Sequence, residues 1–272
     1  MSLQDLPPLR DVLAGAGLLA DKRYGQHFLL DLNITRKIAR LAGPLEGQTV
    51  LEVGPGPGGL TRALLEAGAV VVAVETDPRF LPILEALSAA ADGRLTVVQA
   101  DALAVDETAL LGAAAHVVAN LPYNVGTPLL IKWLTGPFRP ASMTLMFQKE
   151  VAERIVAAVG ADDYGRLAVI SQAICRAEKV MDLPARAFTP PPKVASAVVR
   201  LTPLDEPPTA AISAALQRVT QAAFGQRRKM LRSSLKTLGG ATLCVRAGIN
   251  PDARAETIPV AGFLALAAAN LG

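Results

Sequence analysis

A polar and aromatic turn directly follows a short apolar run in the sequence AHVVANLPYNVGTPLL, residues 115–130. The side-chain oxygen of Asn120 and the main-chain carbonyl of Leu121 can each accept a hydrogen bond from one exocyclic amino group. Pro122 restricts the backbone so that both acceptors converge, and Tyr123 offers a flat face on which a base can stack. Taken alone, the same residues also fit a structural turn whose tyrosine fills the edge of a sheet.

This pair of acceptors suits a nitrogen that is conjugated to an aromatic ring, such as N6 of adenine. Such a nitrogen is a poor nucleophile because its lone pair is delocalised into the ring. Two acceptors that draw it toward tetrahedral geometry free the lone pair to attack a methyl group. The cationic product loses its proton readily, so no strong general base is needed. Catalysis of this kind depends mainly on positioning and electrostatics.

A glycine-rich turn, EVGPGPGG at residues 52–59, follows an apolar run and opens a helical pattern. Gly54 and Gly56 permit a tight turn and let a ligand approach the main chain. The spacing also matches G-x-G-x-x-G, so an NAD site or a purely structural turn remains an alternative. Pro55 and Pro57 remove two N–H groups, which disfavours a pyrophosphate but is harmless for a nucleoside.

Acidic residues end the next two expected strands. Glu75 can accept both hydroxyls of a ribose, and Asp101 can accept from an adenine amino group, because the carboxyl ends of parallel strands face the ligand crevice. Each could instead be a solvated acid at a strand end. Together with the glycine turn they indicate an adenosine-like ligand. A sulfonium-bearing adenosine fits well, because the acids attract positive charge and no phosphate-binding cation is nearby.

The elements that must position these residues alternate between strands and helices. Expected strands cover residues 49–54, 69–75, 95–100, 116–120 and 143–148. The helical patterns between them predict a parallel sheet that is covered on both faces. Two more strands are expected at 177–184 and 196–201, followed by a proline-rich linker at 202–208 and helices from about residue 210. We therefore predict an α/β fold with a Rossmann-like domain over residues 1–203 and a small all-helical domain over 204–272.

Composition limits the cellular setting and the partners. Of the 272 residues 51% are hydrophobic, and the net charge of +3 permits nucleic acid binding without requiring it. Cys175 and Cys244 are isolated in the sequence, which predicts a reducing compartment and no structural metal. No apolar run approaches the length of a membrane span, and the first residues lack the apolar core of a signal peptide. We expect a cytoplasmic monomer.

Positive charge is concentrated in one stretch near the C-terminus. No acidic residue interrupts it, which favours phosphate contacts over a merely solvated helix face, and it consists of Arg227, Arg228, Lys229, Arg232 and Lys236. Binding through such contacts should weaken steeply as salt increases.

Taken together, these motifs resemble those of the ribosomal RNA adenine N6-dimethyltransferase family, in the small-subunit branch of the kasugamycin-dimethylase type. The matching stretches span most of the chain in order, and they are YGQHFLLD (24–31), VLEVGPGPGGLT (50–61), VVAVETD (71–77), QADAL (99–103), NLPYNVGTPLL (120–130), FTPPPKVASAVVRL (188–201) and FGQRRKMLRSSL (224–235). The combination of NLPYN with FTPPPKV is specific.

The resemblance implies S-adenosylmethionine as the methyl donor and 16S rRNA of the 30S particle as the partner, with two adjacent adenosines near its 3′ end each dimethylated. It also implies a cofactor pocket lined by Gln26, His27, Leu29, Gly54, Gly56, Glu75, Asp101 and Asn120. Phe188 would flank the target adenine opposite Tyr123, and the C-terminal domain would help to hold the RNA. His27 departs from the family, which commonly has asparagine at this position.

Other functions stay open at this stage. A large-subunit rRNA methylase of the macrolide-resistance type is related, although the PPPKV loop and the C-terminal pattern argue against it. A ribosome-assembly factor whose binding matters more than its chemistry could coexist with the enzyme. A small-molecule methyltransferase or an NAD enzyme is disfavoured by the basic segment and by NLPYN.

Overall fold

The computed structural model describes residues 3–20, 26–112, 115–226 and 228–272. Their contacts divide the chain into two compact units, Met1–Ala152 with Lys179–Arg200, and Glu153–Glu178 with Leu201–Gly272. The sequence predicted one boundary after residue 203. By contacts, however, residues 153–178 cluster with the C-terminal helices, so the units are interleaved along the chain.

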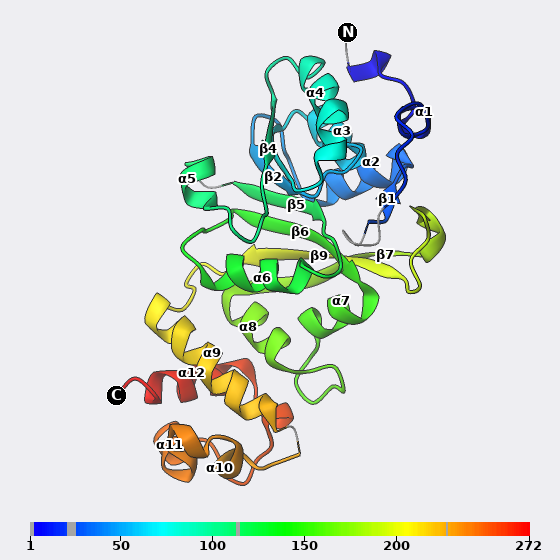
Figure 1. Ribbon diagram of the computed structural model, residues 1–272. Helices are drawn as coiled ribbons and strands as arrows, with labels where there is room; N and C mark the ends of the chain where they lie inside the picture. Colours follow the sequence, from blue (N-terminus) through cyan, green and yellow to red (C-terminus); the bar gives the residue numbers. More distant parts are fainter. Residues whose placement is uncertain (1–2, 21–25, 113–114, 227) are drawn as a thin grey trace. The chain divides into compact units, whose positions relative to one another are not determined.

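A seven-stranded sheet, formed mostly by the first unit, has the strand order β4-β3-β2-β5-β6-β9-β7 (Figure 1). The strands are β2 (Thr49–Val53), β3 (Val70–Glu75), β4 (Leu95–Gln99), β5 (His116–Asn120), β6 (Ser142–Gln148), β7 (Cys175–Leu183) and β9 (Ser196–Pro203). The first five pair in parallel, as predicted. The strand order reverses beside β2, whose neighbours are β3 and β5, and such a reversal opens a ligand crevice at the carboxyl ends of the strands.

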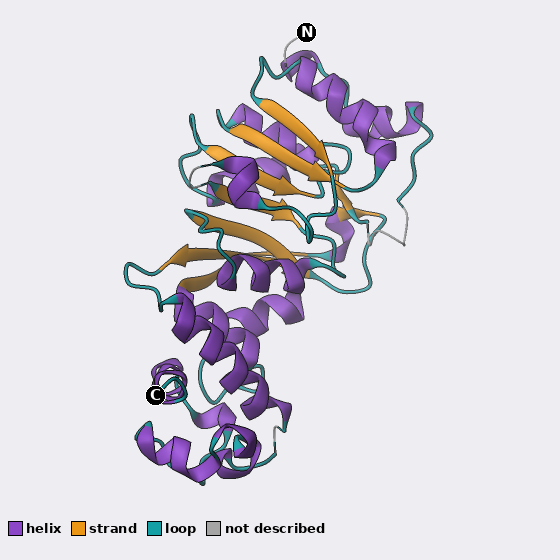
Figure 2. Cartoon of the chain, turned by 60° about the vertical axis from the view of Figure 1, so that its left-hand side comes forward, coloured by secondary structure: helices purple, strands orange, loops and turns teal. Residues whose placement is uncertain are grey.

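Both faces of the sheet are covered at its centre. The consecutive β5 residues Val117, Val118 and Ala119 are all 0–1% exposed, although successive side chains of a strand point to opposite faces. Figure 2 shows helices lying alongside the strands. The helices that follow or precede the parallel strands are α2 (Leu32–Leu41), α3 (Gly59–Glu66), α4 (Leu81–Ala89), α5 (Glu107–Leu111), α6 (Gly126–Thr135) and α7 (Lys149–Val156).

A second, two-stranded sheet was not predicted from the sequence. The short strand β1 (Phe28–Leu29), which follows α1 (Leu9–Gly15) along the chain, pairs antiparallel with β8 (Phe188–Thr189). Residue 29 lies opposite residue 188 in this pairing. The strands bring the N-terminal segment next to the FTPPPKV loop.

The second unit is helical and has its own core. Its longer helices are α8 (Arg166–Ile174), α9 (Ala210–Gly225) and α12 (Val260–Ala269). Phe224 stacks on Phe263 with ring centroids 5.3 Å apart, and Tyr164 meets Phe224 edge-on at 6.2 Å. The buried Tyr164 hydroxyl donates to the carbonyl of Ile258 at 2.9 Å. None of the described helices is both long and apolar enough to cross a membrane.

The basic stretch of this unit is not the continuous helix that the sequence predicted. Only α10 (Leu231–Ser234) and a 3-10 turn at Lys236–Leu238 form there, before α11 (Gly240–Arg246). The prediction was wrong because Met230 is extended and forms a bridge with Arg254. The following N–H of residue 231 donates to the carbonyl of residue 253 at 2.9 Å. A helix therefore cannot begin before residue 231.

Candidate active site

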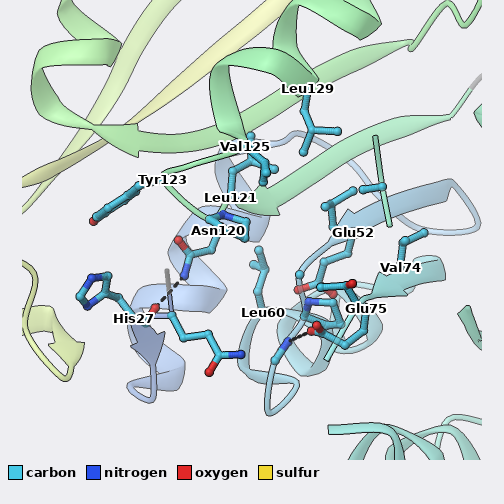
Figure 3. Close-up of a pocket in the computed structure, with 18 of the residues that line it drawn as sticks. His27, Glu52, Leu60, Val74, Glu75, Asn120, Leu121, Tyr123, Val125 and Leu129 are labelled. Carbon is cyan, nitrogen blue, oxygen red and sulfur yellow. Dashed lines mark hydrogen bonds between the residues drawn. The ribbon is translucent and has the colours of Figure 1, made fainter. Parts of the chain in front are cut away.

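A pocket opens at the carboxyl ends of β2, β3 and β5 in the first unit (Figure 3). All the residues that the resemblance assigned to the cofactor line this pocket, namely Gln26, His27, Leu29, Gly54, Gly56, Glu75, Asp101 and Asn120. The turn residues Leu121, Pro122 and Tyr123 line it as well. The structure thus brings together segments that are almost a hundred residues apart in the sequence.

The glycine turn lies at the floor of the pocket and needs its glycines. Gly54 and Gly56 have φ angles of 69° and 53°, a region that side chains disfavour. A Cβ on Gly54 would be 3.4 Å from the Pro122 ring, and one on Gly56 would be 3.3 Å from the Phe28 ring. The turn is therefore packed between the Asn-Leu-Pro-Tyr turn and the N-terminal segment.

Glu75 ends β3, is only 5% exposed, and shapes the glycine turn as well as facing the pocket. One carboxylate oxygen accepts from the N–H of Gly56 at 3.0 Å, and the other accepts from the N–H of Asp77 at 2.8 Å. Burial raises the pKa of this carboxyl, and the backbone N–H donors oppose that shift. Each oxygen retains a second lone pair, so Glu75 can still accept from a ligand hydroxyl.

Glu52 is a pocket residue that the sequence analysis missed. It lines the pocket next to Glu75, as Figure 3 shows, and is 1% exposed. Burial raises the pKa of Glu52 to about 8, and the nearby Thr61 hydroxyl opposes this shift without forming a hydrogen bond of normal geometry. Its Oε2 has no hydrogen-bond partner among the described residues. A lone acid inside the apolar strand TVLEV was the signal that could have revealed it.

The charge of the pocket favours a cation. Glu75 and the exposed Asp101 supply its negative charge, and Asp101 accepts from the N–H of Leu103 at 2.9 Å, whereas the raised pKa of Glu52 keeps that carboxyl largely protonated near neutral pH. No lysine or arginine is among the described residues that line the pocket. Carboxyl groups without a cationic partner stabilise a bound positive charge, so the lining fits a sulfonium better than a phosphate.

Asn120 ends β5, and its amide has a fixed orientation. The Nδ2 group donates to the main-chain carbonyl of His27 at 3.2 Å, a bond that is drawn in Figure 3. The amide oxygen remains as an acceptor at the pocket. Asn120 is partly exposed and is not turned into the packed interior. The use of this oxygen to accept from the substrate stays a prediction.

Tyr123 and His27 lie together on the side of the pocket opposite the two glutamates (Figure 3). Their ring centroids are 5.4 Å apart, with planes tilted by 33°. The tyrosine hydroxyl bonds to the Ser196 hydroxyl at 2.7 Å, and the Nδ1–H of His27 donates to the carbonyl of Pro190 at 2.8 Å. The imidazole that departs from the family pattern thus supports the tyrosine ring and the proline loop.

Phe188 lies in the core of the structure. It is 3% exposed, belongs to the hydrophobic core with Leu29 and Ile38, and is absent from the lining of the pocket. The physical reason is the pairing of β8 with β1, which places residue 188 within the core cluster. The predicted role of Phe188 beside the target adenine, opposite Tyr123, stays a prediction.

The predicted RNA-binding residues belong to the second unit. Arg228 and Lys229 are exposed. Arg232 is also exposed and pairs with Asp252 at 2.8 Å. Arg227 lies outside the described residues. No group of histidine, cysteine, aspartate or glutamate within the described parts of the chain could hold a metal ion.

Comparison with known proteins agrees with this geometry. The family model described as ribosomal RNA adenine dimethylase matches residues 17–269. A Caulobacter vibrioides protein named ribosomal RNA small subunit methyltransferase A is 72% identical over 93% of this chain and 98% of its own length. A Phenylobacterium zucineum protein of the same name is 68% identical over 98% and 94%.

Two solved structures share the fold over most of their length. A dimethyladenosine transferase from Plasmodium falciparum has a TM-score of 0.74 and 26% identity, with 88% of this chain and 96% of the other covered. The 23S rRNA methyltransferase ErmE has a TM-score of 0.69 and 26% identity, with 90% and 100% covered.

Proposed function

This chain belongs to the ribosomal RNA adenine dimethylase family, and we propose that its substrates are two adjacent adenosines near the 3′ end of 16S rRNA in the 30S particle or its precursor. It is an S-adenosylmethionine-dependent methyltransferase that dimethylates adenine N6 in rRNA. The proposal of the small subunit rests on the two relatives named small subunit methyltransferase A. We also propose that the protein acts in the cytoplasm as a monomer.

The observation that carries the proposal is the polarity of the pocket, with carboxyl groups on one side and a free amide acceptor on the other. S-adenosylmethionine supplies an activated methyl group on a sulfonium when it is bound. Glu75 would hold the ribose hydroxyls, and Asp101 would accept from the adenine amino group of the cofactor. Glu75 and Asp101 favour the positive charge, because no lysine or arginine is among the described residues that line the pocket.

The Asn-Leu-Pro-Tyr turn would orient the target base. The amide oxygen of Asn120 and the carbonyl of Leu121 would accept the two hydrogens of N6, and Tyr123 would stack on the ring. The base must leave its stack in the RNA to reach this position. Two acceptors and a fixed stacking face supply orientation and electrostatic stabilisation, which together account for large rate effects.

The role of Asn120 is tested with Asn120→Ala and, as a matched control, the same substitution at the exposed Asn33 of α2. We expect Asn120→Ala to lower turnover on the order of 10²–10³-fold, comparable to loss of one positioned hydrogen bond in a transition state. Cofactor affinity, measured by calorimetry, should change little. Mass spectrometry of adenosines from unmodified 30S particles measures turnover, and wild-type methylation by Asn120→Ala would refute the assigned role.

A large-subunit substrate is the second candidate, favoured by the similarity to ErmE. Labelled cofactor supplied with 30S or 50S precursors separates the two possibilities, and we expect label in the 30S RNA. A role in small-subunit assembly is supported by the exposed Arg228, Lys229 and Arg232, and by Arg227 of the same stretch. We expect the Asn120→Ala protein to retain 30S binding, which a pull-down with immature particles measures.

A further inference from the structure

Lys132 is a partly buried cation on α6 that the proposed chemistry does not use. Its ammonium donates to the carbonyl of Ala102 at 2.9 Å, to the carbonyl of Val105 at 2.5 Å and to Oε1 of Glu107 at 2.8 Å. These three bonds use all three N–H groups of a lysine. The ammonium therefore spans the whole loop between β4 and α5.

The carboxylate that Lys132 meets is itself held in place. Glu107 is 4% exposed, and its Oε1 also accepts from the indole N–H of Trp133 at 2.7 Å. Trp133 is 1% exposed, so it is fixed by the core around α6. We call Lys132, Glu107 and Trp133 the α6 clamp. A hydrogen-bonded ion pair with one buried partner holds its geometry, whereas removal of the cation leaves the buried carboxylate without its counter-charge.

The loop that the clamp holds forms one wall of the pocket. Residues 100–103, which include Asp101, line the pocket directly. Lys132 itself is not among the lining residues, although Leu129, one turn earlier on α6, is. The N-terminal end of α6 follows directly on the Asn-Leu-Pro-Tyr turn, with Val125 as its capping residue. The clamp thus ties the wall at 100–103 to the helix that begins at the opposite, target-facing turn.

We propose that Lys132 is a positioning residue, which holds the wall at residues 100–103 against α6 and thereby sets the affinity for the adenosine part of the cofactor. This inference rests on the proposed cofactor site. Lys132 acts through main-chain carbonyls and touches neither the cofactor nor the target base. Its contribution is to restrict the loop before the ligand arrives, so that binding does not have to order it.

Removal of the ammonium has two effects that must be separated. Lys132→Met breaks the two bonds to loop carbonyls, and it also strands the buried carboxylate of Glu107, which destabilises the fold. The double variant Lys132→Met with Glu107→Gln removes the stranded charge but does not restore the loop bonds. Glu107→Gln alone keeps both loop bonds, because the glutamine oxygen can still accept from Lys132 and Trp133.

Calorimetric titration with S-adenosylmethionine and with S-adenosylhomocysteine measures affinity without turnover. We expect Lys132→Met and the double variant to bind both ligands about 10-fold more weakly. This loss is smaller than the roughly 100-fold effect of misplacing a group by about 1 Å, because the loop is loosened and not displaced. Glu107→Gln should bind within about 2-fold of wild type. Hydrogen exchange of the amides at residues 101–106 should accelerate only in the two variants that lack Lys132.

Arg94→Met is the matched control, because Arg94 donates to the carbonyl of Leu65 at 2.7 Å and neither residue lines the pocket. It should lower the melting temperature without changing cofactor affinity. The inference is overturned if the double variant binds as wild type does, or if Arg94→Met weakens binding equally. If the wild-type protein itself binds neither ligand, the proposed cofactor site is refuted. That result differs from one in which the wild type binds and the Lys132 variants bind equally well, which refutes only the role of Lys132.

Discussion

The buried Glu52 gives a direct test of the electrostatics of the pocket through the substitution Glu52→Gln. Burial raises the pKa of this carboxyl to about 8 in the folded chain, from an ordinary value of 4.5. Between these two values the folded state keeps a proton that the unfolded state has lost. The free energy of unfolding should therefore be highest below the lower value and should fall as pH rises toward the upper one.

The slope of the unfolding free energy against pH follows from the one proton that the folded state retains and the unfolded state loses. It amounts to about 1.4 kcal/mol per pH unit, or about 2.7 kcal/mol between roughly pH 5.5 and 7.5. Glu52→Gln keeps the size of the side chain but cannot ionise, so this slope should vanish in the variant. The stability of the variant relative to wild type should then increase by that amount across the same interval. Contributions from other titrating groups largely cancel in the difference.

Urea unfolding of both proteins at the two pH values measures this difference. The same substitution at the exposed Glu46 serves as the control for the loss of one carboxyl group at the surface. A constant difference between wild type and Glu52→Gln would refute the reasoning, because it would mean that Glu52 titrates alike in the folded and unfolded chains.

Three further predictions concern the ring at the pocket, the glycine turn and the basic stretch. Tyr123→Phe keeps the stacking face and should retain most methylation, whereas Tyr123→Ala should lose it in the same mass-spectrometric assay. Gly59→Ala places a Cβ 2.5 Å from the main-chain oxygen of Leu29 and should destabilise the fold by about 1–3 kcal/mol in urea unfolding. Replacing Arg228 and Lys229 together by alanine should reduce the salt dependence of 30S binding, with a change of roughly 2 in the logarithmic slope.

The parallel sheet and most of its pocket were predictable because their signals are local. Each central strand is an apolar run that ends in a polar or glycine residue, and the parallel arrangement then requires these ends to meet at one edge. Glu75 and Asn120 were identified in this way. The turn at 120–123 was also recognisable from the types of its residues, since an amide, a proline and a tyrosine seldom serve a purely apolar sheet edge.

The errors arose where distant segments decide the local structure. A two-residue strand such as β1 has no periodicity, and it forms only because β8, about 160 residues later, supplies its partner. The same pairing explains why Phe188 lies in the core. The basic stretch has helical composition, but its backbone pairs with residues 251–254 before a helix can start. Glu52 was missed because the apolar residues around it predict only a buried strand and give no sign that this side chain faces a pocket.

The hydrogen bond from the Asn120 amide to the carbonyl of His27 has a consequence for discrimination between bases. It uses one of the two N–H groups of the amide and holds the amide nitrogen toward residue 27, so the amide oxygen is directed toward whatever enters beside Tyr123 (Figure 3). Guanine or uracil would bring a carbonyl oxygen to this place, and the two oxygens would repel each other. Rotation of the amide to supply an N–H would break the bond to residue 27. We therefore expect a segment remote in sequence to disfavour keto bases at this position.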